Sequence, residues 1–86
     1  MKIYPYKEKP NIDFYRVEDY SEKEGPFPEG THKIAIIYEG EREPISIMGF
    51  QTVGNEDKPF FISRLEPSKL ERAVKFIEEH VWNEEQ

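Results

Sequence analysis

Eighty-six residues make one small domain, and folding of so short a chain buries only about 60% of its surface. Charged residues make up 35% of the chain and the formal net charge is -6, which disfavours a duplex nucleic-acid binder, while the charge is too weak for a mimic of DNA. The absence of cysteine excludes disulfides, thiolate nucleophiles and cysteine-ligated zinc.

The amino-terminal third has little regular patterning. Residues 1–11 carry two prolines and alternate tyrosine with charged residues, which predicts an extended arm. Residues 12–17 have the β-branched and aromatic density of a strand. Residues 18–30 contain two prolines and two glycines and predict a long loop. Phe27, between the two prolines, is expected to anchor this loop in the core, with a recognition motif as the alternative.

From Thr31 the pattern changes to a meander. Alternating apolar stretches over 31–39, 44–53 and 60–65 are separated by short glycine-containing turns, so we expect antiparallel strands that are neighbours in the sheet. A helix over 67–83 follows, with Pro67 suited to its first position and an apolar stripe of Leu70, Ala73, Val74, Ile77 and Val81.

The sequence therefore predicts a single α+β domain over residues 1–86. We expect a four-stranded antiparallel sheet within 12–66, interrupted by the long loop 18–30, and one carboxy-terminal helix on one face of the sheet, in the order ββββα. No apolar stretch approaches the 18 or so residues of a membrane span, and no signal-peptide core follows Met1, so we expect a cytoplasmic protein.

Both faces of the predicted sheet are apolar. Alternation places Ile34, Ile36 and Tyr38 on one face of their strand and Ala35 on the other, and Phe50 and Phe61 likewise oppose apolar neighbours. One helix covers only one face, so the second needs a cover. The arm, a second copy of the chain and a ligand are the three alternatives.

Little in the sequence indicates catalysis. The serines lack a nucleophile-elbow context, His32 and His80 are far apart, and Glu78, Glu79 and His80 point in different directions on a helix. The five glycines are scattered, which argues against a phosphate-binding loop. We expect no enzyme, no metal, no cofactor and no small-molecule substrate.

The leading hypothesis is a non-catalytic interaction module. It would bind another protein, or itself as a homodimer, through an aromatic sheet face and the end of the helix. The residues expected to contact the partner are Tyr38, Phe50, Phe61 and Trp82.

The segment 31–81 also resembles the carboxy-terminal domain of the transcriptional coactivator positive cofactor four. The matching positions are Ile62, Ser63, Pro67, Leu70, Ala73 and Ile77, at a strand end and in the helix after it. The resemblance implies an antiparallel sheet followed by a helix, a dimer, and binding of single-stranded DNA on the sheet.

The chain departs from that family where its strand usually carries an arginine and an acidic residue, since this chain reads ISIMGFQ, and it has one extra residue before Pro67. The fold and the dimer are therefore expected to carry over better than nucleic-acid binding. The alternative function is nonetheless a single-stranded nucleic-acid binder, with contacts from Lys33, Tyr38, Phe50, Lys58, Phe61 and Arg64.

Overall fold

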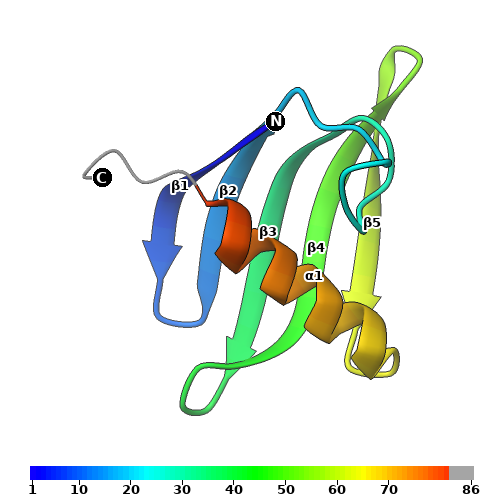
Figure 1. The fold of residues 1–86 in the computed structure, drawn as a ribbon. Helices are drawn as coiled ribbons and strands as arrows, with labels where there is room; N and C mark the ends of the chain where they lie inside the picture. The colour runs from blue at the N-terminus through cyan, green and yellow to red at the C-terminus, as the bar shows by residue number, and fades with distance from the viewer. Residues whose placement is uncertain (82–86) are drawn as a thin grey trace.

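The fold consists of one antiparallel sheet and one helix, in a computed structural model that describes residues 1–81. The strands are β1 (Lys2–Lys9), β2 (Ile12–Glu18), β3 (Thr31–Glu39), β4 (Glu43–Val53) and β5 (Glu56–Ser63), and the helix is α1 (Pro67–His80). Strands adjacent in sequence are adjacent in the sheet, in the order β1-β2-β3-β4-β5 (Figure 1). The predicted class, an α+β fold with an antiparallel meander before a carboxy-terminal helix, is confirmed.

The predicted number of four strands is wrong, because the arm expected over 1–11 forms strand β1. This strand pairs with β2 along the edge of the sheet, with an irregularity in register between Pro5 and Lys7. Proline lacks a backbone donor, so it is tolerated at an edge and at a bulge, where no ladder hydrogen bond is lost. Pro5 is therefore compatible with an edge strand, and Pro10, the other proline of this stretch, lies in the turn after β1.

Helix α1 lies diagonally across one face of the sheet (Figure 1). It begins with Pro67 and buries Leu70, Ala73, Val74 and Ile77, which confirms four of the five residues of the predicted stripe, and it also buries Phe76. The helix ends at His80, because Val81 is extended and bridges to Ile3 of β1. It is thus shorter than the expected range 67–83, of which residues 82 and 83 lie outside the described part of the chain.

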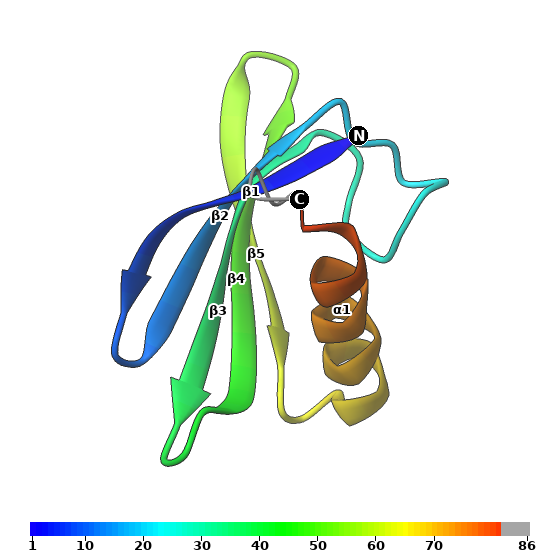
Figure 2. The same cartoon turned by 60° about the vertical axis from the view of Figure 1, so that its left-hand side comes forward.

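The loop between β2 and β3 covers part of the same face beside the helix (Figure 2). Phe27 is 2% exposed and its ring packs edge-on against Tyr20 and Phe76, with centroid separations of 5.9 and 5.7 Å. The Tyr20 hydroxyl accepts a hydrogen bond from the Phe27 backbone N–H at 2.8 Å and donates one to its carbonyl at 2.9 Å. The prediction that Phe27 anchors this loop is confirmed.

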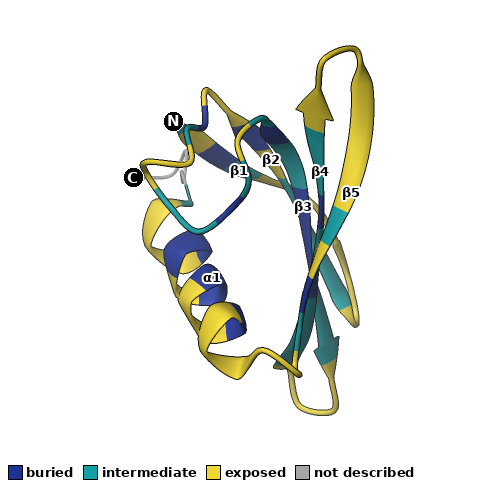
Figure 3. Cartoon of the chain, turned by 90° about the vertical axis from the view of Figure 1, so that its right-hand side faces the viewer, coloured by how far each residue is buried: buried dark blue, intermediate teal, exposed yellow. Residues whose placement is uncertain are grey.

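The opposite face of the sheet has no element over it in residues 1–81 (Figures 2 and 3). The helix and the long loop both lie on the other side, and the amino-terminal arm extends the sheet as β1. Of the three covers considered from the sequence, the arm is therefore excluded. We call this uncovered surface the open face.

Replacing Ile3 by alanine is expected to cost about 2 to 5 kcal/mol of unfolding free energy. The Ile3 side chain is 0% exposed and lies in the core that the sheet forms with α1. Urea denaturation followed by circular dichroism measures the loss. The exposed Lys7 of the same strand is the control, and its replacement by alanine should change the unfolding free energy by less than about 0.5 kcal/mol. A cost for Ile3→Ala as small as that for Lys7→Ala would mean that β1 is not part of the cooperative fold.

Candidate functional site

The open face is defined by side-chain alternation along the strands. Ile34 and Ile36 on β3, Ile47 on β4 and Ile62 on β5 are buried toward the helix, so the residues between them point away from it. Tyr6 of β1 also lies on the side away from the helix, because its ring contacts the Phe14 ring and the Lys33 ammonium. Across the central part of the sheet the open face carries Tyr6, Phe14, Arg16, Lys33, Ala35, Ile37, Met48, Phe50, Pro59 and Phe61.

One row of the open face is apolar. Phe14 of β2 pairs with Ala35 of β3, Ala35 pairs with Met48 of β4, and Met48 pairs with Phe61 of β5. These four residues, which we call the apolar row, form a line across the strands. Phe61 is 61% exposed at one end of the row. At the other end, Tyr6 is 47% exposed and its ring centroid lies 6.0 Å from that of Phe14. Exposed aromatic surface thus lies at the Phe61 end of the row and, through Tyr6, beside its Phe14 end.

The adjacent row carries two cations between aromatic groups. Arg16 of β2 pairs directly with Lys33 of β3, and Lys33 pairs with Phe50 of β4. We call these three residues, with Tyr4 opposite Arg16 on β1, the basic row. The Lys33 ammonium lies 5.9 Å from the ring centroids of Tyr6 and Phe14 and 5.8 Å from that of Phe50. This cation is therefore surrounded by rings of three different strands.

The two cations have no acidic partner. Within residues 1–81 neither Arg16 nor Lys33 forms an ion pair, and neither the apolar row nor the basic row contains a carboxylate. Like charges that stand directly opposite each other on adjacent strands destabilise a sheet. An anionic group placed over the pair would remove this repulsion, so the arrangement suits a negatively charged ligand.

Only some of the sequence-predicted residues meet on this surface. Lys33, Phe50 and Phe61 lie together on the open face. Tyr38 packs on the helix side, and Lys58 points to that side as well, because it alternates with Pro59. Arg64 lies beyond the end of β5 and pairs with Glu39 at 3.0 Å. Trp82 lies outside the described residues.

Sequence reasoning missed Tyr6, Phe14 and Arg16. Alternation along 12–17 already places Phe14 and Arg16 on one face of that strand. Which face it is depends on the pairing of β2 with β3, and the long loop between those strands leaves this register unspecified. Tyr6 was missed because its segment was expected to be an arm. The additional residues double the number of rings and cations at the centre of the face.

Tyr38 belongs instead to a cluster that joins two turns of the sheet. The Arg42 guanidinium lies over the Tyr38 ring, with 4.0 Å between Cζ and the ring centroid. It also donates hydrogen bonds to Asp13 Oδ2 at 2.5 Å and to the Pro10 carbonyl at 3.3 Å. Arg42 has a positive φ of 68°, which is rare for a residue with a Cβ, so these contacts compensate for local strain.

The fold is expected to lose stability above about pH 10 because of Tyr38. Burial, followed by the nearby Tyr15 and Asp13, raises the pKa of the Tyr38 hydroxyl above its ordinary value of 10.0. Above that pH the unfolded chain releases this proton while the folded chain retains it, so the unfolding free energy falls as pH rises. Urea midpoints at about pH 8 and about pH 11 measure the fall, and Tyr38→Phe should reduce it. An equal fall in both proteins would remove Tyr38 as its cause.

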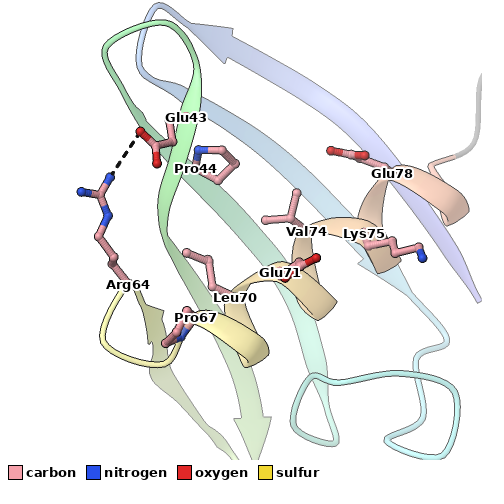
Figure 4. Close-up of a pocket in the computed structure, with 9 residues that line it drawn as sticks. All are labelled: Glu43, Pro44, Arg64, Pro67, Leu70, Glu71, Val74, Lys75 and Glu78. Carbon is pink, nitrogen blue, oxygen red and sulfur yellow. Dashed lines mark ion pairs between the residues drawn. The ribbon is translucent and has the colours of Figure 1, made fainter.

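A groove of about 640 Å³ lies between α1 and the start of β4, on the helix side (Figure 4). Pro44, Leu70 and Val74 supply its apolar lining. The charged residues at the groove are Glu43, Arg64, Glu71, Lys75 and Glu78, and Arg64 pairs with Glu43 at 3.9 Å. Both signs of charge are present, and no single ligand chemistry is favoured.

The described residues contain no group of three or more histidine, aspartate or glutamate side chains arranged to hold a metal ion. In residues 1–81 no helix has the length and apolar character needed to cross a membrane. Comparison with known proteins leaves the family of the chain undetermined, because no family model, no curated protein and no solved structure matches it.

Proposed function

We propose that this chain is a non-catalytic binding module that holds single-stranded nucleic acid on the open face of its sheet. The observation that carries the proposal is the Arg16 and Lys33 pair, two unpaired cations set among aromatic rings on a surface that nothing in residues 1–81 covers. Phosphates are attracted by the cations, and bases stack on the rings.

A single strand fits this surface better than a duplex does. In a duplex the faces of the bases are already stacked on one another, so exposed rings on the sheet gain no base contact. The net charge of -6 also opposes strong binding to a duplex. Most of the chain's carboxylates lie in the long loop, the β3–β4 turn and helix α1. Alternation places Glu18 and Asp57 on the open face near the ends of their strands, but the two central rows are basic within an acidic protein.

A protein partner, or a second copy of the chain, is the second candidate. It is favoured by apolar exposure near the free edge of β5, where Phe61 is 61% and Leu65 is 93% exposed. Exposed apolar groups of this kind are typical of interaction surfaces. Two copies that packed open face against open face would bring their Arg16 and Lys33 pairs together. A protein partner is therefore expected to contact the surface around Phe61 and Leu65, beside β5, and not the whole open face.

Fluorescence anisotropy with a labelled 12-residue oligothymidylate tests the proposed function. Two phosphate contacts predict a fall in affinity of about sevenfold between 50 and 200 mM salt. A matched duplex should bind more weakly than the single strand. No anisotropy change at a protein concentration of about 100 µM in 50 mM salt would overturn the proposal. Sedimentation of the free protein as a stable dimer would then favour the second candidate.

A further inference from the structure

We infer that the nucleic acid crosses the strands of the sheet, with its bases over the apolar row and its phosphates over the basic row, and that only about three to five nucleotides make contact. This inference rests on the proposed function. It specifies the orientation of the bound nucleic acid relative to the β-strands and the number of nucleotides in contact, and both follow from the register and the width of the sheet.

The direction follows from how the two rows are arranged. Each row runs across the sheet, because its members are direct pairing partners on successive strands. Arg16 and Lys33 lie two residues along their strands from Phe14 and Ala35, which separates the rows by about 7 Å. A base and its own phosphate are separated by a similar distance. A nucleic acid that runs along both rows therefore places its bases on the rings and its phosphates near the cations at the same time.

A path along the strands fits less well. Such a path would follow β2 and β3, and from Arg16 and Lys33 it would continue past Phe14 to Ile12 and Ile37. Beyond Phe14 this direction offers aliphatic groups and Lys9, which pairs with Ile12, but no further ring. The exposed rings of Tyr6 and Phe61 lie instead on β1 and β5, at the two sides of the sheet. Ring placement therefore favours the crossing path.

The length follows from the width of the sheet. Neighbouring strands are about 4.8 Å apart, so β1 and β5 are separated by about 19 Å. A single strand advances by about 3.4 Å per nucleotide when stacked and by up to about twice that when extended, so this width holds about three to five nucleotides. Within the basic row the cations lie on β2 and β3 only, so this row neutralises about two phosphates whatever the length of the ligand.

A length series of oligothymidylates measured by competition anisotropy tests the length. Affinity, corrected for the number of equivalent registers, should rise up to about five nucleotides and then stay constant, with an unchanged salt dependence. A steady rise to twelve nucleotides would overturn the short footprint while leaving the proposed function intact. Absence of binding at every length would remove the proposed function and this inference with it.

Two alanine variants test the direction. Phe61→Ala, at the β5 end of the apolar row, should weaken binding about five- to a hundredfold by removing one base stack. Ile12→Ala, on the path along the strands, should change affinity by less than about twofold. The reverse pattern would show that the strand runs along β2 and β3. Thermal melting of both variants ensures that the compared affinities belong to folded protein.

Discussion

Replacing Lys33 by glutamate is expected to abolish binding while leaving the fold intact. The change removes one charge-assisted phosphate contact and places a carboxylate in the middle of the proposed ligand path, so affinity should fall at least about a hundredfold. The new carboxylate stands opposite Arg16 and relieves the like-charge repulsion, although the contact of the Lys33 ammonium with three rings is lost. Each of these two opposing terms is below about 1 kcal/mol, so the unfolding free energy should change little.

Lys58→Glu is the matched control for this variant. It makes the same change in net charge on β5, and its side chain points to the helix side of the sheet. A general effect of acidity would weaken binding equally in both variants, whereas a local contact predicts a large loss only for Lys33→Glu. Anisotropy in 50 mM salt with urea denaturation of each protein makes the comparison. A retained affinity in Lys33→Glu would contradict the assignment of the open face.

The parts of the fold that the sequence predicts correctly are those set by local periodicity. The helix follows from a stripe of residues at three- and four-residue spacing, and its burial against the sheet is the only way to remove that stripe from water. Strands β3 and β4 and the order of β3, β4 and β5 follow from alternation and short turns. Strand β5 spans Glu56–Ser63 instead of the expected 60–65, because residues 56–59, expected as part of a turn, pair with the end of β4. Strand β1 could not be predicted in this way, because its proline, Pro5, is tolerated only through the strand's position at the edge of the sheet.

The residues of the candidate site likewise fall into those that local periodicity predicts and those that depend on the pairing of distant strands. Lys33, Phe50 and Phe61 were predictable because they alternate with core residues on strands joined by short turns. Alternation along β3 also shows that Tyr38 shares a face with Ile34 and Ile36, so its grouping with Phe50 and Phe61 conflicted with the pattern. Arg16 became visible as a partner of Lys33 only through the pairing of β2 with β3, which is a tertiary property. The feature that carries the proposed function is thus the one that local sequence does not encode.

Truncation of Phe27 to alanine is expected to cost about 3 to 5 kcal/mol of unfolding free energy. The ring is 2% exposed and lies 5.7 Å from Phe76 and 6.1 Å from Phe60, measured between centroids, so its removal leaves a cavity among three elements. The whole stability of a domain of this size is about 5 to 15 kcal/mol, so the loss is a large fraction of it. Urea denaturation followed by circular dichroism gives the value.

Phe61→Ala provides the counterpart on the other side of the same sheet. Its ring is 61% exposed, so the same truncation should cost less than about 1 kcal/mol of unfolding free energy while weakening binding. Phe27→Ala should behave in the opposite way, with a large loss of stability and unchanged affinity wherever the protein remains folded, because the loop and the open face lie on opposite sides of the sheet. A weaker affinity in folded Phe27→Ala would show that the two faces are coupled, and the open face would then not be an independent binding surface.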